Sequence, residues 1–143
     1  MPYLFEFTYH NPTQIVFGPN SFAKLGSLVP AEAKVLLLYG GGSIKGNGVY
    51  DKVIAALAGR EVVEFAGVEP NPTLETLSAA VDLAKRRKID FILGVGGGSV
   101  SDGAKYVACA ALYDGDGWDI VSGRHFPKVA LPVGIVLTLP ATG

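Results

Sequence analysis

Two glycine-rich segments contain the residues whose types and spacing suit phosphate binding. Gly96-Gly97-Gly98-Ser99 follows the apolar run 91–95, and Gly40-Gly41-Gly42-Ser43 follows the apolar run 35–39. A glycine-rich turn from a strand into a helix lets backbone N–H groups converge on an anion, and the helix N-terminus adds partial positive charge. Because glycine has no side chain, a phosphate can come close to the backbone. The spacing therefore predicts a phosphate- or pyrophosphate-binding loop.

The central loop also fits a purely structural interpretation. Ser99 is a good helix N-cap and Asp102 falls three residues later, so the two could form a capping box. Gly103 could serve only to let the helix approach the sheet. The segment also departs from the dinucleotide fingerprint, because a serine stands where the last glycine should be and no acid on a following strand obviously takes the ribose role. Both interpretations stay open at this point.

Composition and charge limit the classes of protein to consider. The chain of 143 residues has the length of about one domain, and its 49% hydrophobic content is enough for a core. Basic and acidic residues number 12 and 13, so nothing electrostatic points to nucleic acid. One cysteine excludes an internal disulfide, no apolar run approaches the roughly 20 residues of a membrane span, and the first residues lack a signal peptide's basic region. We expect a soluble, cytoplasmic α/β domain with no nucleic-acid or membrane partner.

The order of apolar patterns predicts a Rossmann-like fold. Residues 4–9 and 14–17 are rich in aromatic and β-branched residues, which predicts an N-terminal β-hairpin. Helical patterns then alternate with buried strands, which predicts a mostly parallel, doubly wound sheet with helices on both faces. The expected strands are 35–39, 61–65, 91–95 and 133–139. The helix after the second strand is expected to have Asn71 as its cap and Pro72 at its first position.

In a doubly wound sheet, the carboxyl ends of neighbouring strands open on one crevice where ligands bind. The two glycine loops could therefore hold different phosphates of one dinucleotide.

Several segments together resemble the iron-containing (group III) alcohol dehydrogenases. The resemblance lies in residues 12–18, 96–102 and 137–143, and it extends over essentially the whole chain. Residues 39–43 and 69–72 are most similar to the branch of NADP-dependent aldehyde reductases and butanol dehydrogenases. The chain matches only the N-terminal half of that family, which implies that residues 1–143 are its N-terminal dinucleotide-binding domain.

The resemblance implies a role for each candidate cofactor-binding residue. Gly96, Gly97, Gly98 and Ser99 match the pyrophosphate loop, and Asp102 matches an acidic residue near the nicotinamide. Thr138, Leu139 and Thr142 match a segment that lines the cofactor cleft. Gly40, Gly41, Gly42 and Ser43 match a loop near the adenosine ribose.

The family's metal ligands, an Asp and three His, belong to a C-terminal helical domain that this chain lacks. His10 and His125 stand far apart in sequence, so we expect no catalytic residue and no metal site within residues 1–143. The resemblance implies that a divalent metal, Fe or Zn, belongs only to a full-length protein, and we expect this segment alone to be inactive.

The leading hypothesis is the cofactor-binding domain of a metal-dependent, NADP-linked alcohol dehydrogenase or aldehyde reductase, which transfers hydride between NADPH and a carbonyl. NADP is favoured over NAD because the strand ending at Tyr39 delivers no acid, whereas Ser43 and Lys45 follow it. A small alcohol or aldehyde is the expected substrate, and a homodimer could form through the N-terminal strand. The alternatives are a stand-alone nucleotide- or phosphate-binding module and another enzyme of the superfamily, such as a glycerol dehydrogenase or a dehydroquinate synthase.

Overall fold

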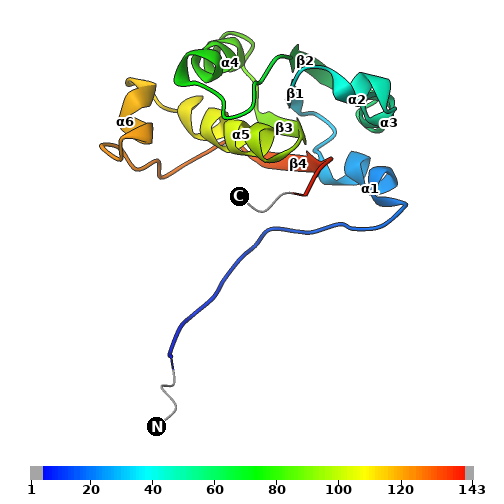
Figure 1. Ribbon diagram of the computed structural model, residues 1–143, viewed down its shortest axis with the longest axis horizontal. Coiled ribbons are helices and arrows are strands. Elements are labelled where there is room, and N and C mark those ends of the chain that lie inside the picture. Colours follow the sequence, from blue (N-terminus) through cyan, green and yellow to red (C-terminus); the bar gives the residue numbers. More distant parts are fainter. Residues whose placement is uncertain (1–4, 141–143) are drawn as a thin grey trace.

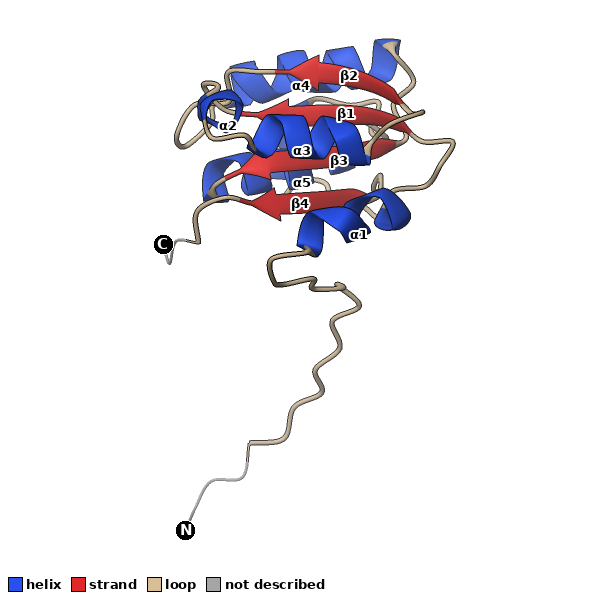
Figure 2. Cartoon of the chain, turned by 90° about the vertical axis from the view of Figure 1, so that its right-hand side faces the viewer, coloured by secondary structure: helices blue, strands red, loops and turns tan. Residues whose placement is uncertain are grey.

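Four parallel strands form one sheet in the computed structural model, which describes residues 5–140. The strands are β1 (Lys34–Tyr39), β2 (Glu61–Phe65), β3 (Phe91–Gly96) and β4 (Val133–Leu137). They lie in the order β2-β1-β3-β4, and Figure 2 shows their arrowheads at the same edge. β1 and β3 are apolar runs buried on both faces, as central parallel strands are. The predicted parallel α/β sheet is therefore confirmed.

Helices cover both faces of the sheet, as predicted for a doubly wound fold. They are α1 (Ser21–Leu28), α2 (Ser43–Gly46), α3 (Val49–Ala56), α4 (Leu74–Arg86), α5 (Gly98–Ala110) and α6 (Gly117–Val121). Successive side chains of β1 point to opposite faces. Leu36 therefore packs in a core cluster with residues of α4 and α5, whereas Leu37 packs with residues of α1 and α3. None of the helices in residues 5–140 has the length and apolar character that crossing a membrane requires.

Glycines allow the helices of one face to lie close to β3. A Cβ built on Gly94 would lie 3.0 Å from the Cβ of Ala104 in α5 and 3.1 Å from Cδ1 of Ile135 in β4. A Cβ built on Gly103 of α5 would also be crowded. Its nearest neighbour would be Cδ2 of Leu77 in α4, at 3.0 Å, and not an atom of the sheet. Gly103 thus serves mainly the contact between two helices, where the sequence suggested an approach of helix to sheet.

The predicted N-terminal hairpin is wrong. Residues 5–17 contain no strand and run away from the sheet as an extended segment (Figure 1), and residues 1–4 lie outside the described part. Asn11 makes only local bonds there, since its Oδ1 accepts the Thr13 N–H at 3.0 Å and its Nδ2 donates to the Tyr9 hydroxyl at 3.1 Å. An isolated two-stranded hairpin is marginally stable in water, and within residues 5–140 no further strand packs on this segment.

The close packing at Gly94 generates a stability prediction. Gly94→Val should destabilise the protein by about 3 kcal/mol, because the added side chain has to displace Ala104 and Ile135 in a filled core. Gly46→Ala is the matched control, since a Cβ at Gly46 would meet no heavy atom within 4 Å. Urea unfolding of both variants measures the difference, and an unchanged midpoint for Gly94→Val would contradict this account of the packing.

Candidate nucleotide-binding edge

The two glycine loops lie side by side at the carboxyl edge of the sheet. β1 and β3 are hydrogen-bonded neighbours, and their register places Tyr39 opposite Val95, immediately before the two loops. After β1 the chain continues to β2, which lies on one side of β1, whereas β3 and β4 lie on the other side of β1. The order therefore reverses between β1 and β3, and ligands of open α/β sheets bind in the crevice at such a switch point.

The β3–α5 loop presents backbone donors to solvent. α5 begins at Gly98, and its N-cap Gly97 supplies no side-chain hydrogen bond. The first N–H groups of an α-helix have no partner within the helix, and the Ser101 N–H is the first to bond back, to the Gly97 carbonyl at 3.1 Å. The N–H groups of Gly98 and Ser99 precede it, so they remain available to an anion at the positive end of a helix of 13 residues.

The glycines of this loop differ in what requires them. A Cβ at Gly96 would lie 2.7 Å from Cγ2 of Val100, so packing alone excludes a side chain there. A Cβ at Gly97 or Gly98 would meet no heavy atom within 4 Å, and Gly97 has an ordinary φ of −87°. Neither packing nor backbone conformation within the described residues requires glycine at these two positions. The backbone at these two positions is therefore open to the close approach of a ligand.

The β1 loop has the same open character. A Cβ at Gly41 or Gly42 would meet no heavy atom within 4 Å, whereas one at Gly40 would lie 3.2 Å from the Val68 carbonyl oxygen. Gly42 has a φ of 102°, in the left-handed region that side chains disfavour, and α2 begins at the next residue, Ser43. Conformation therefore explains Gly42, and only Gly41 is free of both constraints.

The capping box proposed for Ser99 and Asp102 is wrong. Because α5 already begins at Gly98, Ser99 lies inside its first turn, and its Oγ accepts the Asn71 N–H at 3.0 Å. The Asp102 carboxylate lies 3.7 Å from the Lys105 ammonium, with its side chain 77% exposed. Asp102 is thus free of any structural role in the cap, and its proposed cofactor role stays a prediction.

A carboxylate holds the loop that supports Ser99. Glu69 Oε1 accepts the Thr73 N–H and the Thr76 hydroxyl, each at 2.9 Å. The pKa of this carboxyl is lowered from 4.5 to about 2. The hydrogen bond from the Thr73 N–H is the largest cause, and the one from the backbone N–H of Glu69 itself is the second. Thr73, and not Asn71, caps α4, so the predicted cap was two residues too early. Asn71 instead has a φ of 50° between two prolines and points its N–H at Ser99.

The end of β4 completes the edge. The Thr138 N–H donates to the Gly96 carbonyl at 2.9 Å, so Thr138 lies directly beside the β3–α5 loop. Leu139 follows with 66% of its surface exposed. Thr142 lies outside the described residues. The structure thus brings the two glycine loops, Ser99 and Thr138 to one edge, and their contact with a cofactor stays a prediction.

Sequence reasoning missed an acid at this edge. Glu64, near the end of β2, accepts hydrogen bonds from the hydroxyls of Tyr39 and Tyr50 at 3.0 and 3.1 Å. Glu64 follows the glycines of the β1 loop by about 20 residues, which is the spacing of the ribose-binding acid in dinucleotide-binding folds. That spacing is the signal in the sequence that points to Glu64.

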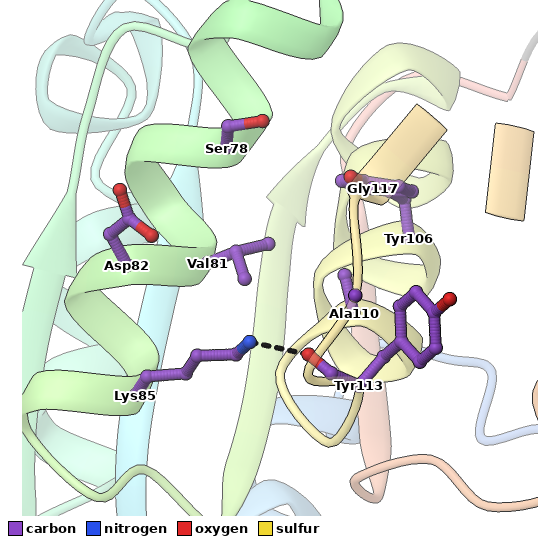
Figure 3. A pocket seen from close by; sticks show the side chains of 9 residues that line it. Ser78, Val81, Asp82, Lys85, Tyr106, Ala110, Tyr113 and Gly117 are labelled. Atoms are coloured by element: carbon purple, nitrogen blue, oxygen red, sulfur yellow. Dashed lines mark hydrogen bonds between the residues drawn. The ribbon is translucent and has the colours of Figure 1, made fainter. Parts of the chain in front are cut away.

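A small cleft of about 100 Å³ lies elsewhere, between α4 and the segment that follows α5 (Figure 3). Its polar lining includes Asp82 and Lys85 of α4, and the Lys85 ammonium donates to the Tyr113 carbonyl at 2.5 Å. None of the glycine-loop residues lines it. The Lys85 hydrogen bond joins the last turn of α4 to the segment that follows α5, so the polar lining of this cleft has a structural role.

Residues 5–140 do not bring together three or more His, Cys, Asp or Glu side chains that could hold a metal ion. The residues of this described part therefore do not fit the metal that the resemblance implies.

The Glu69 geometry generates a prediction of pH dependence. A carboxyl whose pKa is lower in the folded state stabilises the fold fully above its unfolded pKa, and this stabilisation is lost as the pH falls from about 4.5 to about 2. In Glu69→Gln the free energy of unfolding should therefore fall less steeply over this interval than in the wild type. Acid titration of urea unfolding measures both slopes, with Glu32→Gln, an exposed acid far from the loop, as control. Equal slopes for Glu69→Gln and wild type would show that Glu69 is not held as described.

Comparison with known proteins identifies the family. A model described as iron-containing alcohol dehydrogenase matches residues 12–143. The chain is 55% identical to the probable NADH-dependent butanol dehydrogenase 1 of Bacillus subtilis and 51% identical to the NADPH-dependent aldehyde reductase YqhD of Escherichia coli. Each match covers 96% of this chain and 36% of the relative.

Solved structures give the same result. The NADH-dependent butanol dehydrogenase A of Thermotoga maritima superposes with a TM-score of 0.92 at 52% identity, over 96% of this chain and 35% of that one. The chain therefore spans about a third of the length of the relatives it matches. With the family model matching nearly all of its residues, the chain belongs to the iron-containing alcohol dehydrogenase family.

Proposed function

We propose that this chain is the cofactor-binding part of an NADP-linked alcohol dehydrogenase or aldehyde reductase. The observation that carries the proposal is the open space at Gly97 and Gly98, where neither packing nor backbone conformation requires glycine, next to uncapped N–H groups of α5. The relatives are named as dehydrogenases or reductases that use NADH or NADPH. A dinucleotide fits both facts, because its pyrophosphate needs backbone donors and close approach.

In this proposal the chain's own residues bind and orient the cofactor. The N–H groups of Gly98 and Ser99 donate to the pyrophosphate, and the Asn71 N–H holds the Ser99 hydroxyl toward the loop after β2. The β1 loop around Gly41 receives the adenosine ribose. Thr138 and Leu139 line the crevice on the β4 side. When bound, the dinucleotide supplies or accepts the hydride.

The substrate proposed for the whole protein is a small alcohol or aldehyde, in line with the names of the relatives. NADP is proposed over NAD because the β1 loop contains no acid and is followed directly by Ser43 and Lys45 of α2. A relative named as NADH-dependent is 55% identical and one named as NADPH-dependent is 51% identical, so overall similarity does not decide between the two cofactors.

The proposal predicts a graded effect of side-chain size at Gly98. Gly98→Val should weaken NADPH binding by at least about tenfold, roughly 1.4 kcal/mol, because the side chain occupies the space reserved for the pyrophosphate. Gly98→Ala should give a smaller loss. Since a Cβ at this position meets no neighbour, the melting temperature should change little. Calorimetry with the full-length protein measures the dissociation constants, and unchanged affinity in folded Gly98→Val would refute the pyrophosphate role.

A second prediction concerns Asp102, which is proposed to lie near the nicotinamide. Asp102→Asn should lower turnover at saturating cofactor by about tenfold, or 1.4 kcal/mol in the barrier. Stability should change by no more than ~1 kcal/mol, because the exposed pair with Lys105 contributes little. Lys105→Ala is the matched control, since it breaks the same ion pair but keeps the carboxylate. Normal turnover in Asp102→Asn would remove Asp102 from the site.

A further inference from the structure

Glu64 lies where an open α/β sheet holds the ribose of a dinucleotide. It belongs to β2, which pairs with β1, and its register partner in β1 is Leu37, two residues before Tyr39. In NAD-binding sheets, an acid at this place accepts the ribose 2′-OH. The side chain is exposed to solvent, so burial does not prevent it from meeting a ligand.

Both carboxylate oxygens of Glu64 are already engaged. Tyr39 donates its hydroxyl to Oε1 at 3.0 Å, and Tyr50 of α3 donates to Oε2 at 3.1 Å. The two rings meet edge to face, with their centroids 6.2 Å apart. Tyr39 is nearly buried, so its hydroxyl is fixed by the fold. A carboxylate that already accepts a hydrogen bond on each oxygen has less capacity left for a third hydroxyl group.

The Lys45 ammonium lies over the same two tyrosine rings. The Lys45 ammonium lies 4.8 Å from the centroid of the Tyr50 ring and 5.6 Å from that of Tyr39. The Tyr39 side chain is the main cause that raises the pKa of Lys45. A lysine ammonium is charged at neutral pH in any case. Lys45 belongs to α2, which begins at the end of the β1 loop. The loop proposed to receive the ribose is thus bordered by a positive charge and by a carboxylate whose two oxygens both accept hydrogen bonds.

We propose that Tyr39 and Tyr50 mask the Glu64 carboxylate, and that this mask together with Lys45 makes the β1 edge accept a 2′-phosphorylated ribose. The inference rests on the proposed cofactor role and names Tyr50 and Glu64 as determinants of cofactor choice. An unmasked carboxylate would repel a 2′-phosphate and accept a free 2′-OH. Hydrogen-bonded to both hydroxyls, the carboxylate keeps its charge, but the two donors weaken its field, so the charge of Lys45 beside the same rings outweighs its repulsion of a 2′-phosphate.

The variant Tyr50→Phe removes one of the two hydroxyls that donate to Glu64 and keeps the aromatic ring. Calorimetry of the full-length protein compares 2′,5′-ADP with 5′-AMP, two probes that differ only in the 2′-phosphate. Wild type should bind 2′,5′-ADP more tightly, and Tyr50→Phe should lower this preference about tenfold. Glu64→Gln in the Tyr50→Phe background should restore the preference, because the freed group no longer carries charge. Lys45→Met should weaken binding of 2′,5′-ADP and leave that of 5′-AMP unchanged.

Tyr113→Phe is the matched control, since the Tyr113 hydroxyl also donates to a carboxylate, Asp119 at 3.0 Å, but at α6 and away from the glycine loops. It should leave the preference unchanged. If Tyr50→Phe melts early, Tyr39→Phe carries the same comparison. Binding of both probes with an unchanged ratio in folded Tyr50→Phe, or a wild-type preference for 5′-AMP, would overturn this inference alone. Failure of wild type to bind NADPH, NADH and both probes would overturn the proposed function with it.

Discussion

The close contact of α5 with β3 is the constraint on which the candidate site depends. Gly94 leaves room for Ala104, and Gly96 leaves room for Val100, so the helix lies directly against the central strand. This approach fixes where the first turn of α5 emerges, and therefore where its free N–H groups point. A bulkier residue at either glycine would push the helix away and move the anion site with it. The loops after β1 and β4 depend on the same contact because both strands pair with β3.

Features that depend on neighbouring residues could be predicted from the sequence. The apolar runs at 35–39 and 91–95 are long enough, and free enough of polar residues, to indicate buried parallel strands. The glycines after each run indicate loops, and the alternation with helical patterns gives the doubly wound arrangement. Parallel strands end at the same edge of such a sheet, so the sequence was sufficient to bring the two glycine loops to one edge. The order β2-β1-β3-β4 comes from the structure.

Features that depend on distant residues could not be predicted in the same way. The pattern of residues 5–17 is typical of strands, but a strand forms only where a partner supplies its hydrogen bonds, and residues 5–140 supply none there. Ser99 resembles an N-cap, yet its partner is Asn71, from the loop after β2. The masking of Glu64 needs residues from β1 and α3 to meet at β2, which the sequence alone does not specify.

The central claim is that the carboxyl edge between β1 and β3 binds a dinucleotide with its pyrophosphate at the N-terminus of α5. The most direct test is a crystal structure of the full-length protein with NADPH. The account predicts pyrophosphate oxygens within hydrogen-bond distance, about 3 Å, of the Gly98 and Ser99 nitrogens, and the 2′-phosphate beside Lys45. A dinucleotide bound elsewhere, such as in the cleft between α4 and the segment that follows α5, with the β3–α5 loop free of it, would contradict the account.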